Sequence, residues 1–155
     1  MIDFSLEITE LQGFKEDFDG LAQSLFELRP DIDEDEFPEQ KRFAVAGQII
    51  HTRYRVAALV THIQNRIEEE TEMGEEQVDE LLEPVYHAFM NDDDLVGPMI
   101  DEIAVCMNNT FALSFISRYQ DIVLSVLNYC KKGDARCLQK KFREIPIRDF
   151  SDEPK

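Results

Sequence analysis

The stretch EQKRFAVAGQIIHTRYRVAALVTHIQNRIEEETE, residues 39–72, carries the longest helical pattern in the chain and decides the fold. Its apolar side chains recur every three or four residues, so they form one face of a helix. The residues of this face are Val45, Ala46, Ile49, Ile50, Val56, Ala57, Val60, Ile63 and Ile67. Pro38 suits the first turn of such a helix, and Gly74 suits its C-terminal cap. The breadth of the apolar face predicts that this helix lies at the centre of the protein.

The same spacing of apolar residues predicts further helices on both sides of this segment. They cover residues 10–28, 75–91 and 110–132, with another helix that opens at Pro98 and a short last helix capped by Asp134. Pro84 lies inside the 75–91 segment and should kink or split it. A length of 155 residues fits one domain. The sequence therefore predicts an all-α, single-domain bundle of five to six helices over residues 1–155.

The two ends of the chain carry a shorter, alternating pattern. Apolar and polar residues alternate over residues 3–8, which is typical of a strand or an extended arm. Thr9 and Gln12 have the spacing of a capping box, so the first helix is expected to begin just after Thr9. The C-terminal tail, residues 145–155, begins with a similar alternation. We therefore expect a minor two-strand pairing of the N- and C-terminal segments.

The net charge of −17 is distributed in blocks along the chain. Residues 1–40 hold 13 acidic and 2 basic side chains, and residues 68–104 hold 14 acidic and no basic ones. Between them, residues 41–67 hold 5 basic side chains and no acidic one. This alternation has a structural interpretation, in which acidic neighbours neutralise the central helix inside the domain. It also has a functional one, in which part of the acidic charge forms a binding surface.

Such a charge argues against direct binding to nucleic acid or to an anionic membrane, and it favours a basic protein partner. The acidic connector, residues 30–40, and the helix at 75–91 are the segments that carry the candidate partner-binding residues. These are Asp33, Glu34, Asp35, Glu36, Glu75, Glu76, Asp79, Glu80 and Glu83. The working hypothesis is an acidic protein-binding module, such as an inhibitor, an immunity factor, a nucleic-acid mimic or a regulatory adaptor.

An alternative hypothesis is a metal-dependent all-α hydrolase. Glu69 with Glu72, and Glu76 with Asp79, form two closely spaced carboxylate pairs on either side of a short turn. Carboxylate oxygens are the ligands that Mg²⁺ and Mn²⁺ prefer, so these four residues are the candidate metal ligands under this hypothesis. The chain has no glycine-rich phosphate loop and no nucleophile elbow, so no other cofactor is expected.

A third hypothesis is a structural oligomerisation module. His51, Arg55, His62 and Arg66 form one stripe on the 39–72 helix, at spacings that place them on a salt-bridged face or a subunit contact. The two histidines of this stripe are about 16 Å apart along the helix axis, which is too far for one metal ion. Under this hypothesis, the stripe forms the contact between subunits of a homo-oligomer.

Arg53 is the residue that breaks the apolar pattern of the 39–72 helix. It projects near the middle of the apolar face, with Gln64 on the same side. A guanidinium buried alone is very costly, so Arg53 should either reach the edge of the core or have a carboxylate or carbonyl partner. Arg53 and Gln64 are thus candidates for an internal polar site.

The cysteines and the N-terminal segment bear on location. Cys106, Cys130 and Cys137 show no CxxC spacing, so a zinc or redox motif is not expected. The N-terminal sequence lacks the features of a secretory signal, and no apolar stretch reaches the ~18 residues that span a bilayer. These observations predict a cytoplasmic protein that is not embedded in a membrane.

Overall fold

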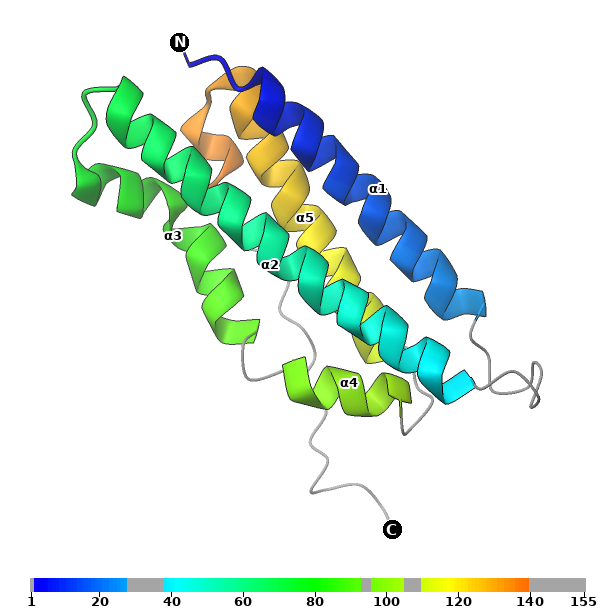
Figure 1. Ribbon diagram of the computed structural model, residues 1–155. Coiled ribbons are helices and arrows are strands. Elements are labelled where there is room, and N and C mark those ends of the chain that lie inside the picture. The colour runs from blue at the N-terminus through cyan, green and yellow to red at the C-terminus, as the bar shows by residue number, and fades with distance from the viewer. Residues whose placement is uncertain (1, 28–37, 93–95, 105–109, 140–155) are drawn as a thin grey trace.

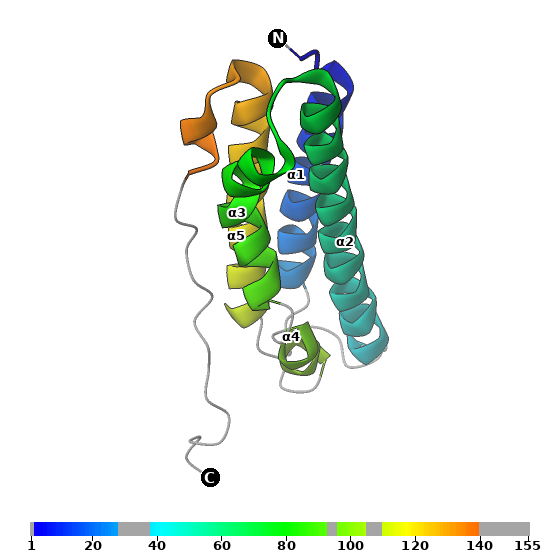
Figure 2. The same ribbon diagram turned by 90° about the vertical axis from the view of Figure 1, so that its left-hand side faces the viewer.

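The computed structural model describes residues 2–27, 38–92, 96–104 and 110–139, and within these ranges the protein is an all-α bundle without strands. The helices are α1 (Ser5–Glu27), α2 (Pro38–Glu70), α3 (Glu75–Asp92), α4 (Val96–Ala104) and α5 (Thr110–Lys132), followed by a 3₁₀ turn, η2 (Ala135–Cys137). Successive long helices alternate in direction and pack side by side, while the short α4 lies across one end (Figures 1 and 2).

Stacked aromatic rings form the centre of the bundle. Tyr119 of α5 is fully buried, and its ring centroid lies 5.9 Å from that of Phe18 on α1 and 5.6 Å from that of Phe89 on α3. Phe115, one turn away on α5, adds a tilted contact at 5.5 Å. Aromatic pairs at such distances contribute to stability beyond their buried area. These ring contacts therefore join α1, α3 and α5 at Tyr119.

The first helix begins earlier than the sequence pattern predicted. Residues 5–8 are helical and not extended, and the Asp3 carboxylate accepts a hydrogen bond from the Ser5 backbone N–H at 2.9 Å. Thr9 lies inside the helix, where its hydroxyl donates to the Ser5 carbonyl. The expected strand over residues 3–8 is therefore wrong, and its proposed partner, residues 145–155, lies outside the described residues.

A glycine was also assigned to the wrong helix. Helix α2 ends at Glu70, before Gly74, and the Gly74 carbonyl instead accepts the backbone N–H groups of Gln77 and Val78. The Gln77 side chain forms one half of a capping box, because it accepts the Gly74 N–H at 3.1 Å. Gly74 thus caps the N-terminus of α3, not the C-terminus of α2.

The proline inside α3 and the end of α5 follow the prediction more closely. Pro84 lies within α3, and Figure 1 shows this helix changing direction partway along its length. Helix α5 covers the predicted residues 110–132. Gly133 follows it directly, with a φ of 68°, the left-handed conformation that favours glycine after a helix.

Candidate functional site

Exposed carboxylates gather where α2 passes into α3, at the end of the bundle opposite α4 (Figure 1). We call this set the acidic corner: Glu69, Glu72, Glu75, Glu76, Asp79, Glu80 and Glu83. Its α3 residues include all five α3 side chains that the sequence proposed for partner binding. Glu75 and Glu76 occupy the first turn of α3, where the helix dipole stabilises negative charge. The other four proposed residues, Asp33 to Glu36, lie outside the described residues.

Most charges of the acidic corner are not compensated within the fold. Only Asp79 has a polar partner in the described ranges, because its Oδ1 accepts a hydrogen bond from Gln64 Nε2 at 2.9 Å. The six glutamates of the corner make no ion pair with any side chain in that same part of the chain. Their negative charge therefore remains directed at solvent.

The metal-site geometry of the hydrolase hypothesis is not present in the described residues. Glu69, Glu72, Glu76 and Asp79 are all exposed, and they do not converge on a common point. No group of three or more His, Cys, Asp and Glu side chains in those ranges is placed to hold a metal ion. Glu69 lies at the end of α2, Glu72 in the turn that follows, and Glu76 and Asp79 on α3, so correct spacing along the sequence did not bring the two pairs together.

The basic stripe of α2 faces α1 of the same chain. Arg66 Nη1 lies 2.6 Å from Oε1 of Glu7, and its Nε lies 2.7 Å from Oε2 of Glu70. The His62 ring nitrogen lies 3.9 Å from the same Glu7 oxygen. The hydrogen bonds to these carboxylates raise the pKa of Arg66. The hydrogen bond to Glu70 has the largest effect, and the hydrogen bond to Glu7 has the next largest. Farther along the helix, Arg55 Nη1 lies 3.7 Å from Asp17 Oδ2.

Acidic side chains of the first block thus neutralise basic side chains of α2 inside the domain. The oligomerisation hypothesis used the same stripe as a subunit contact, but three of its four members, Arg55, His62 and Arg66, contact carboxylates of their own chain. The charge of residues 1–40 is therefore partly a folding feature, whereas the charge of the acidic corner is not.

Arg53 is buried and does not reach the edge of the core. Its Nε donates to the hydroxyl of Tyr119 at 2.6 Å, and its Nη2 donates to the backbone carbonyl of Phe89 at 2.8 Å. That carbonyl belongs to the last turn of α3, where carbonyl groups lack helical partners and the dipole favours a cation. Gln64 belongs to a separate network, in which it binds Asp79 and accepts a hydrogen bond from Tyr86.

Two more buried arginines were missed by the sequence reading. Arg42 is 1 % exposed, and its Nη1 donates to the carbonyl of Ile103 in the last turn of α4 at 3.3 Å. Arg118 of α5 places its Nη2 3.5 Å from the carbonyl of Ala88 in α3. Burial lowers the pKa of Arg42. The sequence did contain a signal for Arg42. It lies three turns from Arg53, so the two arginines share one face of α2.

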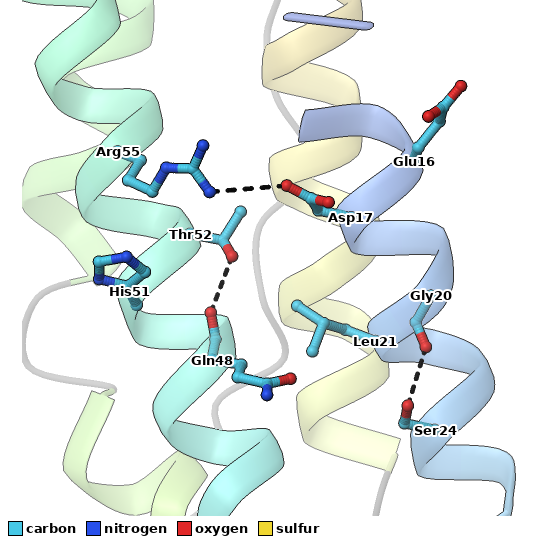
Figure 3. Close-up of a pocket in the computed structure, with 9 residues that line it drawn as sticks. All are labelled: Glu16, Asp17, Gly20, Leu21, Ser24, Gln48, His51, Thr52 and Arg55. Atoms are coloured by element: carbon cyan, nitrogen blue, oxygen red, sulfur yellow. Dashed lines mark hydrogen bonds and ion pairs between the residues drawn. The ribbon is translucent and has the colours of Figure 1, made fainter. Parts of the chain in front are cut away.

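A surface groove lies between α1 and α2, beside the Arg55–Asp17 pair (Figure 3). Its volume is about 460 Å³. Helix α1 contributes Glu16, Asp17, Gly20, Leu21 and Ser24, and α2 contributes Gln48, His51, Thr52 and Arg55. The sequence reading did not find this groove, because it depends on how the two helices are aligned.

No protein-family model, no curated protein and no solved structure matches the chain. Among the described helices, none combines the length and apolar character needed to cross a bilayer.

Proposed function

We propose that the protein is an acidic binding module that engages a basic protein partner through the acidic corner. The observation that carries this proposal is the contrast between two sets of carboxylates. Glu7, Asp17 and Glu70 are paired with arginines of the same chain, whereas the six glutamates of the corner face solvent without such a partner in the described residues. Uncompensated charge costs stability through self-repulsion, so its concentration at one end needs an explanation outside the fold.

The corner is also held in a defined shape, which favours recognition. The hydrogen bond between Gly74 and Gln77 fixes the start of α3, and Gln64 links α2 to α3 through Asp79 and Tyr86. All of the charges except that of Glu72 therefore stand on two helices that these hydrogen bonds hold together. Groups held in place in this way lose less entropy on binding than groups on a flexible tail.

A partner of matching chemistry would present lysines and arginines on a convex or grooved surface. Complementary charge of this kind accelerates association and makes it sensitive to salt. An inhibitor, an immunity factor, a nucleic-acid mimic and a regulatory adaptor all fit this description, and they differ in the identity of the basic partner. Such a protein would meet its partner in the cytoplasm.

The test compares two double variants with equal changes in charge. Glu76→Gln/Glu80→Gln neutralises the corner, and Glu10→Gln/Asp101→Asn neutralises two exposed acids elsewhere on the bundle. Each protein is immobilised and exposed to a native cell lysate at low salt, and the bound proteins are identified and then measured individually by calorimetry. We expect a basic protein that binds the unaltered chain and the control variant but binds the corner variant at least ~10-fold more weakly.

Two results would overturn the proposal. One is that the enriched proteins are not basic. The other is that both double variants bind the same proteins with equal affinity, because the position of the charge would then have no importance.

A further inference from the structure

We propose that the groove between α1 and α2 binds a small zwitterion of the free amino acid class. This site is separate from the acidic corner, and it does not depend on the function proposed for that surface. Three features carry the inference: a loose ion pair at one end of the groove, opposite charges on its two walls, and unused polar groups at its other end.

The ion pair between Asp17 and Arg55 spans the groove without closing it. The two side chains point toward each other from opposite helices, and Nη1 lies 3.7 Å from Oδ2 (Figure 3). A charge-assisted hydrogen bond is shorter, about 2.7–2.9 Å. The same two helices form one such contact elsewhere, since Arg66 approaches Glu7 to 2.6 Å. Of these two contacts between α1 and α2, the one between Asp17 and Arg55 is therefore the looser.

Little stability is lost when this pair opens to admit a ligand. The side chains of Arg55 and Asp17 are 51 % and 49 % exposed, so water solvates both charges. Exposed pairs of this kind contribute only about 0–1 kcal/mol. The Arg55 guanidinium also lies 4.9 Å from the ring centroid of Phe14, which holds it at the wall of the groove when Asp17 is engaged elsewhere.

The charges on the two walls match a ligand that carries both signs on neighbouring atoms. An ammonium group placed between the helices would donate to Asp17 on α1, and the adjacent carboxylate would accept from Arg55 on α2. One loose pair is then replaced by two charge-assisted contacts, which are stronger than contacts between neutral groups. A simple amine or a simple carboxylate would satisfy one wall and leave the opposite charge facing it unpaired. A zwitterion is therefore preferred over either.

The other end of the groove offers hydrogen bonds without formal charge. The hydroxyls of Ser24 and Thr52 donate to carbonyls of their own helices, so their oxygens remain available as acceptors. The Gln48 side chain extends from α2 into the space between the helices (Figure 3), and it makes no hydrogen bond with the described residues. Leu21 supplies an apolar floor. These groups suit a short ligand side chain that carries an N–H or O–H donor.

Gly20 lines the groove from α1, and it places no side chain there. A Cβ atom at this position would meet nothing within 4 Å, so a larger side chain could be introduced at this point without a clash. The volume of about 460 Å³ lies within the range of about 300–1,000 Å³ that is typical of small-molecule sites.

The test is a titration of the isotope-labelled protein with each common L-amino acid, followed by amide NMR. We expect at least one amino acid with a polar, uncharged side chain to shift the resonances of Asp17, Gly20, Gln48 and Thr52 in a saturable manner. Its methyl ester lacks the carboxylate and its N-acetyl derivative lacks the ammonium, so each should bind at least ~10-fold more weakly.

Matched variants place the binding in the groove. Gly20→Leu fills the groove and should weaken binding at least ~10-fold, whereas Gly47→Leu adds the same side chain at an exposed helical position outside it and should not. Arg55→Gln provides a second variant that removes only the carboxylate contact. Thermal unfolding by circular dichroism confirms that each variant is folded.

The proposal is overturned if no amino acid shifts these resonances at millimolar concentration. It is equally overturned if the ester and the N-acetyl derivative bind as well as the parent, or if Gly20→Leu binds normally. Loss of binding in the Glu76→Gln/Glu80→Gln variant would also contradict it, because the acidic corner takes no part in this site.

Discussion

Arg66 Nη1 lies 2.6 Å from Oε1 of Glu7, and this contact explains why α1 begins where it does. Glu7 is 3 % exposed, and it shares one face of the helix with Phe4 and Leu11. Arg66 also donates to the carbonyl of Asp3 at 2.7 Å, and its guanidinium lies over the Phe4 ring. The first turn of α1 is therefore held against α2 by one arginine that compensates a buried carboxylate.

Removal of Arg66 should destabilise the protein more than removal of both partners. Arg66→Met leaves the Glu7 carboxylate buried without its cation, which is the costly half of breaking a buried ion pair. We expect Arg66→Met to lower the urea midpoint clearly, and Glu7→Leu/Arg66→Met to recover a part of the loss. Circular dichroism during urea unfolding measures both.

Arg136 provides the control for this prediction. It pairs with Asp134 at 2.9 Å, but its side chain is 87 % exposed, so Arg136→Met should leave the midpoint unchanged. A double variant at positions 7 and 66 that is less stable than Arg66→Met alone would contradict the explanation.

The hydroxyl of Tyr119 should contribute measurably to stability. It accepts the 2.6 Å hydrogen bond from Arg53 in the core, and Tyr119→Phe removes this acceptor with almost no change in shape. A hydrogen bond to a charged group contributes about 1.5–3 kcal/mol, and we expect a loss of that order in the free energy of unfolding. Tyr129→Phe is the control, because the Tyr129 hydroxyl makes no hydrogen bond with the described residues. Equal losses of unfolding free energy in the two variants would show that the hydrogen bond from Arg53 does not stabilise the fold.

The glycines inside helices and the glycine after α5 should respond to alanine in opposite directions. Gly13→Ala and Gly47→Ala add a methyl group where nothing lies within 4 Å, so each should stabilise the protein by about 0.5–1 kcal/mol. Gly133→Ala should destabilise it by about 1 kcal/mol, because the φ of 68° is unfavourable for a residue with a Cβ atom. Thermal unfolding measures the three changes. If Gly133→Ala instead stabilised the protein, the backbone at residue 133 would have to leave its left-handed conformation in the variant.

The helices of the fold could be predicted from the sequence where both ends carry strong local signals. Helix α5 is such a case, because Lys131, Lys132 and Gly133 mark its end together. The start of α1 could not be predicted, because the buried Glu7 was counted as a solvent-facing residue and hid the helical period. Gly74 suits either the end of one helix or the start of the next, and only the hydrogen bonds of Gln77 decide between them.

The sites, like the helices, could be predicted from the sequence only where local signals determine them. The exposure of the α3 carboxylates follows from local amphipathicity, so the sequence was sufficient to place them on one surface. The partners of Arg53, Arg42 and Arg118 are backbone carbonyls on other helices, and a sequence pattern holds no information on these. The α1–α2 groove depends on the alignment of two helices that are joined through residues 28–37, so it could be found only in three dimensions.

Cys130 should be unreactive in the folded protein. Burial raises the pKa of its thiol to about 12, with a smaller contribution from the negative charge of Glu7. Because the thiolate is the nucleophile, its population near neutral pH falls about a thousandfold relative to an ordinary cysteine. Iodoacetamide at mildly alkaline pH should therefore modify the half-buried Cys137 first and Cys130 only after unfolding, as measured by peptide mass spectrometry. Rapid modification of Cys130 in the folded protein would disprove this.

The same thiol should make the protein less stable in alkali. Its folded-state pKa of about 12 lies above the ordinary value of 9.0, so the folded protein keeps a proton that the unfolded chain loses. The contribution of this thiol to stability is fully present below about pH 9. It is lost as the pH rises from there toward 12, because unfolding then releases a proton. Burial also raises the pKa of Tyr129 and of Tyr86, so these two groups further lower the stability of the fold as the pH rises. Urea midpoints measured across this interval should fall steadily in the unaltered protein. The variant Cys130→Ala loses packing at every pH, but its midpoints should fall less steeply, and an unchanged slope would show that Cys130 does not carry the effect.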